Sequence, residues 1–111
     1  MSQHLYYKTK YNLHECILQI TKEPQQYECN LGTALWYKAE KLSNNQVLIT
    51  FTGGQFRKIM RTQYLMDFLP REDHTLVDMH FQNELFGLPP MTHPSDIDLC
   101  MKQKLNAIRN K

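Results

Sequence analysis

Histidine is the residue type in this sequence that most directly suggests chemistry, because its imidazole transfers protons and ligates metals near neutral pH. No histidine has a partner at a diagnostic spacing such as that of a helical HExxH zinc motif. His80 and Asp78 would share one face of a strand, but the neighbouring alternation places that face outward, where such a pair is ordinarily solvated surface. The sequence therefore predicts no catalytic residue and no metal site. The five histidines are His4, His14, His74, His80 and His93.

The cysteines give no catalytic or structural motif either. Cys16, Cys29 and Cys100 are odd in number and too widely spaced for a CxxC pair, which argues against a disulfide framework and a zinc site. We expect buried free thiols. The chain also offers no placed nucleophile, base or oxyanion donor, so we predict a non-enzymatic protein without a cofactor.

Two basic clusters raise the question of nucleic-acid binding. Neither has interleaved aromatic residues, and the chain has no glycine-rich phosphate loop, RNP-like motif or helix-turn-helix pattern. Nucleic acid is therefore not the expected partner, and the clusters are interpreted as solvated surface and helix-dipole complementation. Their members are Arg57, Lys58 and Arg61, and Lys102, Lys104, Arg109 and Lys111.

Length and composition indicate one globular domain spanning residues 1–111. The sequence has 111 residues, of which 41% are hydrophobic and 22% charged, values near those of ordinary globular proteins. No segment approaches the roughly 20 apolar residues of a membrane span. The first residues lack the apolar core of a signal peptide, so we expect a cytoplasmic protein.

Three consecutive segments between residues 46 and 84 alternate apolar and polar residues, which is typical of half-buried strands. Gly53-Gly54 suits a hairpin turn after the first segment, and residues 70–73 form a second turn. The three segments therefore predict an antiparallel meander. Its inner face is formed by odd-numbered residues of the first segment, even-numbered residues of the second and odd-numbered residues of the third. The predicted inward residues are Val47, Ile49, Phe51, Phe56, Met60, Thr62, Tyr64, Met66, Phe68, Thr75, Val77, Met79 and Phe81.

Two further strands are expected upstream. Residues 4–10 resemble an opening strand, whereas residues 34–42 fit either a strand or a helix. We favour the strand, with Leu35, Tyr37 and Ala39 on one face, because it precedes a polar turn and contains a Leu-Trp-Tyr run.

One helix is predicted before the meander in the sequence and another after it. Asn12 and Glu15 suit a capping arrangement before a helix that begins at Leu13 and ends before Pro24. The second helix has Ser95 as its N-cap and basic residues near its end. Its apolar stripe, Ile97, Cys100, Met101, Leu105 and Ile108, must lie on an apolar surface, and the inner face of the sheet is available.

This order of elements resembles the helix-grip topology of START-like and Bet v 1-like proteins, in which a curved sheet wraps the C-terminal helix. The resemblance covers the whole chain as an order of elements and transfers no functional residue. It implies an α+β fold with an antiparallel curved sheet of about four to five strands on a long C-terminal helix, and a short helix after the first strand. An unrelated α+β sheet with helices on one face is the alternative.

The inner face leads to our first functional hypothesis. Its methionines and aromatic residues would line a pocket for a small apolar ligand between the sheet and the C-terminal helix, or would fill a closed core. The residues concerned are Phe56, Met60, Tyr64, Met66, Met79, Phe81 and Met101.

The second hypothesis is an interaction or homodimerisation module. The connection between sheet and second helix is unusually apolar for a loop, so it either caps the core or offers a patch to a partner. An exposed sheet edge is the other surface available for association. The loop residues are Leu85, Phe86, Leu88 and Met91.

Overall fold

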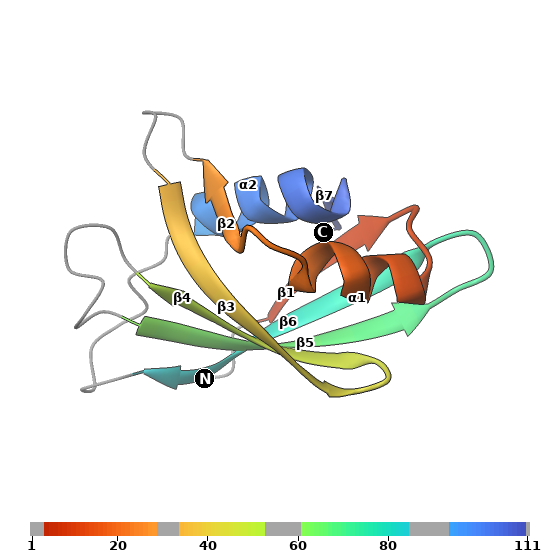
Figure 1. The fold of residues 1–111 in the computed structure, drawn as a ribbon. Coiled ribbons are helices and arrows are strands. Elements are labelled where there is room, and N and C mark those ends of the chain that lie inside the picture. The colour runs from red at the N-terminus through yellow and green to blue at the C-terminus, as the bar shows by residue number, and fades with distance from the viewer. Residues whose placement is uncertain (1–3, 29–33, 53–60, 85–93, 111) are drawn as a thin grey trace.

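The computed structural model describes residues 4–28, 34–52, 61–84 and 94–110, and within these ranges the chain forms seven strands and two helices (Figure 1). The strands form one antiparallel sheet in the order β2-β3-β4-β5-β6-β1-β7. The elements are β1 (His4–Thr9), α1 (Leu13–Thr21), β2 (Gln26–Glu28), β3 (Ala34–Ser43), β4 (Gln46–Thr52), β5 (Arg61–Pro70), β6 (Thr75–Glu84), α2 (Pro94–Leu105) and β7 (Ile108–Arg109).

The alternation in the meander is realised as predicted. Odd-numbered residues of β4, even-numbered residues of β5 and odd-numbered residues of β6 point to one side and form a buried inner face. The register agrees with this, because Ile49 lies opposite Tyr64 and Met66 lies opposite Met79. The residues confirmed as buried are Val47, Ile49, Phe51, Thr62, Tyr64, Met66, Phe68, Thr75, Val77 and Met79, while Phe81 is half-buried and Phe56 and Met60 lie outside the described residues.

The segment that could have been a strand or a helix is the strand β3. Tyr37 is buried on its inner face, and Ala39 is half-buried against the same core. The opening strand is confirmed as well, but β1 pairs with β6 inside the sheet and places Leu5, Tyr7 and Thr9 inward.

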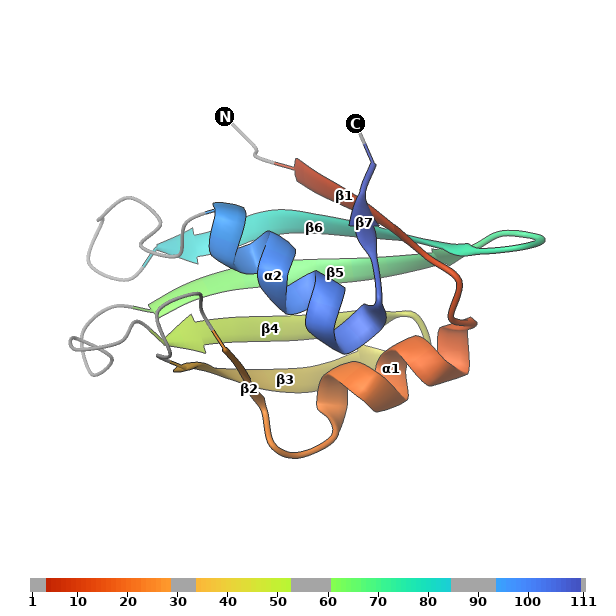
Figure 2. The same ribbon diagram turned by 90° about the horizontal axis from the view of Figure 1, so that it is seen from above.

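Both helices cover the concave side of the sheet, as the two views show (Figures 1 and 2). The predicted cap of α1 is present, because the Asn12 side chain accepts a hydrogen bond from the Glu15 amide at 2.8 Å. We expected the inner face to lie against the C-terminal helix, and the structure adds α1, which packs against β3 and β5 and also contacts α2. The core therefore lies between the sheet and two helices.

The C-terminal helix is shorter than predicted and ends at Leu105. Asn106 adopts a left-handed conformation with φ of 48°, which ends the helix, and the Ala107 amide donates to the Met101 carbonyl at 3.3 Å. Asparagine is one of the few residues that tolerates this conformation. Ile108 consequently leaves the predicted apolar stripe and lies exposed on β7, while Ile97, Cys100, Met101 and Leu105 are buried.

The sheet has seven strands, where about four to five were predicted. The two unpredicted strands, β2 and β7, are three and two residues long and lie at the two edges. Segments this short hold too few residues to establish a period of two. The curled antiparallel α+β architecture itself is confirmed.

Polar contacts tie β1, α2 and β7 together. The Tyr7 hydroxyl donates to an Asp98 carboxylate oxygen at 2.5 Å, and Arg109 lies 3.6 Å from the other oxygen of that carboxylate. The Thr9 hydroxyl donates to the Leu105 carbonyl at the end of α2. Burial, together with the hydrogen bond to Asp98, raises the pKa of Tyr7 far above its ordinary value. These contacts attach the first half and the last residue of α2 to the first strand.

Candidate functional site

The described residues of the predicted ligand site belong to the hydrophobic core. Tyr64, Met66, Met79 and Met101 are each exposed by no more than 2%, and Phe81 packs against them while half-buried. Phe56 and Met60 lie outside the described residues. The loop residues proposed for interaction, Leu85, Phe86, Leu88 and Met91, lie outside them too.

Aromatic rings fill the part of this inner face nearest β3 and β4. The Phe51 ring is fully buried and lies 6.0 Å from Tyr27, 6.1 Å from Tyr37 and 6.1 Å from Tyr64, measured between ring centroids. Tyr64 in turn meets Phe81 at 5.8 Å in an edge-on arrangement. Edge-on pairs at these distances are favourable packing geometries, so these side chains contact one another.

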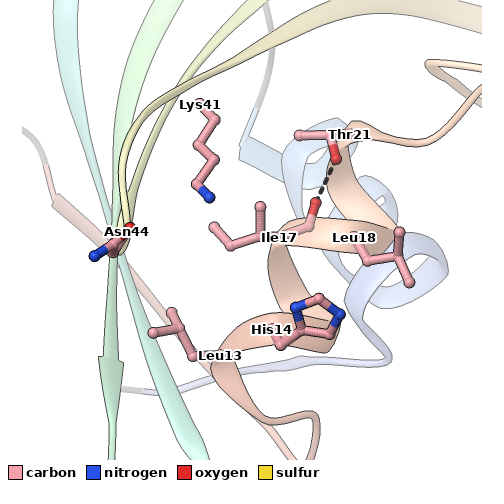
Figure 3. A pocket seen from close by; sticks show the side chains of 7 residues that line it. All are labelled: Leu13, His14, Ile17, Leu18, Thr21, Lys41 and Asn44. Carbon is pink, nitrogen blue, oxygen red and sulfur yellow. Dashed lines mark hydrogen bonds between the residues drawn. The ribbon is translucent and has the colours of Figure 1, made fainter.

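A groove with a volume of about 360 Å³ lies between α1 and the far end of the β3–β4 hairpin (Figure 3). Its lining comes from one side of α1 and from β3 and the turn that follows it. We call it the α1 groove, and its lining residues are Leu13, His14, Ile17, Leu18, Thr21, Lys41 and Asn44.

Helix periodicity explains why apolar residues line the α1 groove. The Asn12 cap starts the helix so that Leu13 and Ile17, one turn apart, both point from α1 towards the end of β3, where each is half-buried against the core. Leu18 stands beyond this stripe with 47% of its surface exposed. The groove is therefore an apolar continuation of the core that reaches the surface.

The opposite wall of the groove is polar. Lys41 follows Tyr37 and Ala39 on the inner side of β3, and Figure 3 shows its side chain extending from the strand towards α1. A register irregularity between Lys41 and Ser43 precedes Asn44 in the turn. A lysine at such an edge keeps its ammonium group in water while its aliphatic stem covers apolar surface.

The lining of the groove suits the binding of a partly apolar group. Its apolar wall suits an aliphatic or aromatic group, and Lys41 and Asn44 offer hydrogen-bond donors beside that wall. Among the lining residues, the Thr21 hydroxyl is engaged with the Ile17 carbonyl at 2.6 Å and is not placed as a nucleophile.

The sequence predictions did not include the α1 groove, although two signals pointed to it. Leu18 is a large apolar residue that lies off the helix face shared by Leu13, Cys16, Ile17 and Ile20. Lys41 takes the inward position after Ala39 in the alternation of β3. Together they indicate an apolar helix surface beside a charged strand end. The distance between the two elements could not be deduced from either segment alone.

The predicted free thiols are confirmed for the described cysteines. Cys16 and Cys100 are both buried and free, whereas Cys29 lies outside the described residues. Burial raises the pKa of Cys16 to about 11 and that of Cys100 to about 12, from an ordinary value of 9.0. Because the thiolate is the reactive form, these thiols are poor nucleophiles in the folded protein.

The curled antiparallel sheet with α1 after its first strand and α2 after its last long strand defines a helix-grip-like α+β fold. The solution structure of the Aha1 dimer from Colwellia psychrerythraea is similar to this chain, with a TM-score of 0.56 and 13% sequence identity. The match covers 94% of this chain and 93% of that chain. At this identity the likeness concerns the fold alone.

Sequence comparison adds no family assignment, because no family model and no curated protein matches the chain. Within the described residues, no helix is long and apolar enough to cross a membrane.

Proposed function

We propose that this protein is a non-enzymatic interaction domain that forms a homodimer, with the α1 groove of each copy covered by the other copy. The observation that carries the proposal is the exposed apolar side of α1, where Leu18 is 47% exposed beside a groove lined by Leu13 and Ile17. Apolar surface of this kind, rimmed by polar groups, is typical of association sites. The protein of similar fold described above is itself a dimer.

A two-fold arrangement suits this surface, because the same patch then serves both copies. The Leu18 side chain of one copy would enter the groove of the other, and Lys41 and Asn44 would form part of the polar rim. Fully burying an exposed leucine side chain contributes about 1.5–3 kcal/mol, so covering the exposed part of Leu18, which is 47% exposed, contributes roughly half of that in each copy. The two symmetric insertions therefore both add to the association energy.

The edge of β3 is a weaker candidate for association. Beyond β2, the Tyr37 amide donates to the Gln25 carbonyl and the Ala39 amide to the Gln25 side chain, so part of the edge is already paired. Lys38 lies between these two residues and Lys41 lies further along the strand, and lysines on an edge strand discourage pairing with another chain. We therefore assign the association to the α1 groove rather than to this edge.

Leu18→Glu is expected to weaken the dimer at least about tenfold, because it loses the apolar burial and places a carboxylate in the contact. Ile108→Glu is the matched control, since Ile108 is 69% exposed on β7, at the other edge of the sheet. Sedimentation equilibrium across a range of concentrations measures both. A wild-type chain that stays at its monomer mass of 13.2 kDa throughout would refute the proposal. Equal weakening by the two variants would refute the assignment to the groove.

Ligand binding between the sheet and α2 is a second proposal, favoured by the cluster of Met66, Met79 and Met101, because methionine side chains repack around varied shapes. These side chains are fully buried, so a ligand would have to displace them. Native mass spectrometry of the gently purified protein tests this. A retained small molecule would support the proposal, and a mass equal to that of the chain alone would contradict it.

A further inference from the structure

Three potential metal ligands converge on the outer face of the sheet, where β1 pairs with β6. His4 lies directly opposite His80 in the register, and Asp78 lies two residues before His80 on the same face of β6. The His4 Nδ1 atom is 2.9 Å from the Asp78 Oδ1 atom, and the two imidazole rings are 5.2 Å apart. When one ligand atom is taken from each of the three residues, these atoms all lie within 4.8 Å of one another.

The imidazole of His80 has an unsatisfied atom. Its Nδ1 is buried and has no hydrogen-bond partner among the described residues. A buried polar atom without a partner is unfavourable, because it has lost its hydrogen bonds to water and gained none in the protein. Coordination of a cation is one way in which an imidazole nitrogen at this position becomes satisfied, because the metal accepts the nitrogen lone pair.

The charges around the cluster also favour a cation. Asp67 on β5 lies directly opposite Asp78 on β6, and like charges in that position repel. Gln46 donates to Asp67 at 2.8 Å, but no lysine or arginine in the described parts of the chain pairs with either carboxylate. A divalent cation beside Asp78 would offset this repulsion.

We propose that His4, Asp78 and His80 bind a zinc ion on the outer face of the sheet. Two imidazoles and one carboxylate form a ligand set typical of zinc with a fourth position open to water or to another ligand. Tetrahedral zinc brings its ligand atoms to about 3.3–3.6 Å from one another, since each bond is about 2.0–2.2 Å long. The cluster must therefore close slightly, and His4, whose side chain is 34% exposed, has room to do so. This site does not depend on the α1 groove.

Isothermal titration of the untagged, chelator-treated protein with zinc chloride in a non-coordinating buffer tests the site. We expect saturation at one zinc per chain, and a loss of affinity of at least about tenfold in His4→Ala and in His80→Ala. His74→Ala is the matched control, because His74 also pairs with an aspartate, Asp73, at 2.6 Å but belongs to no cluster of three among the residues that the structure describes. Circular dichroism checks that each variant is folded.

Two results would overturn the inference. One is a wild-type protein that shows no saturable zinc binding, in which case His4 and Asp78 form only a cross-strand hydrogen bond. The other is zinc binding that His4→Ala and His80→Ala leave as strong as in His74→Ala. His4→Ala keeps the test decisive if His80→Ala fails to fold, because His4 is an exposed residue near the start of β1. Cobalt substitution adds a readout, since tetrahedral coordination by these ligands gives visible absorption that the His4→Ala variant would lose.

Discussion

Phe51→Ala is expected to lower the free energy of unfolding by about 3–5 kcal/mol, the largest effect predicted here for a single substitution. Phe51 is fully buried on the inner face of β4, and its ring meets those of Tyr27, Tyr37 and Tyr64. The substitution removes the apolar burial and these ring contacts, and the close-packed surroundings relax only in part to fill the space. Urea unfolding followed by tyrosine and tryptophan fluorescence measures the change.

Leu48→Ala is the matched control for Phe51→Ala. Leu48 lies on the same strand but faces the other side of the sheet, where it is only half-buried opposite Leu65. We expect it to cost clearly less stability, because less surface returns to water and no closed cavity forms. If Leu48→Ala destabilises the protein as much as Phe51→Ala, the assignment of the core to the concave side of β4 is wrong.

Stability is expected to fall steeply as the pH rises above about 9, because several buried groups must stay protonated in the folded state. Burial raises the pKa of Cys16 to about 11 and that of Cys100 to about 12, from 9.0. Burial likewise raises the pKa values of Tyr7, Tyr37 and Tyr64 above 10.0. In the unfolded chain these groups lose their protons first, so the unfolded state binds fewer protons and is stabilised relative to the folded state as the pH rises.

The sign and the pH window of this effect follow from the same values. Below the unfolded pKa of the thiols the stabilising contribution is complete, and between the unfolded and folded values it is lost by up to about 1.4 kcal/mol per pH unit for each group. Urea unfolding under reducing conditions, repeated from neutral pH to about pH 11, measures it. Cys100→Ala should lose less stability over this range than the wild type. A wild-type stability that does not change above pH 9 would contradict the prediction.

The period-two pattern was sufficient to predict the long strands and their inner faces. The odd-numbered residues from Val47 to Phe51, the even-numbered residues from Tyr64 to Phe68 and the odd-numbered residues from Thr75 to Met79 were placed on the buried side, because a period of two leaves no freedom once one face is apolar. The end of α2 was missed because Ile108 continues the helical spacing, whereas the left-handed conformation of Asn106 decides the end of the helix. Short edge strands such as β2 carry no comparable pattern.

The cluster of His4, Asp78 and His80 and the α1 groove could not be predicted from the sequence, for a related reason. His4 and Asp78 are 74 residues apart, and their proximity depends on the register of β1 against β6, which no local pattern encodes. Asp78 and His80 were correctly expected on one outward face, but their third partner was not. The α1 groove likewise depends on the packing of a helix against a strand end, although Leu18 and Lys41 each departed from the simple pattern of its own element.

The position of β1 in the sheet has a consequence for how the chain folds. β1 is the first strand in the sequence, but its two neighbours, β6 and β7, are the last two strands. During synthesis β1 therefore emerges long before its sheet partners, whereas β3 to β6 can pair with their neighbours as they are made. Pairings between such distant segments carry a high cost in loop-closure entropy and slow folding. We expect the joining of β1 to the sheet to be the late step, during which the apolar side chains of Leu5 and Tyr7 stay exposed to chaperones and to aggregation.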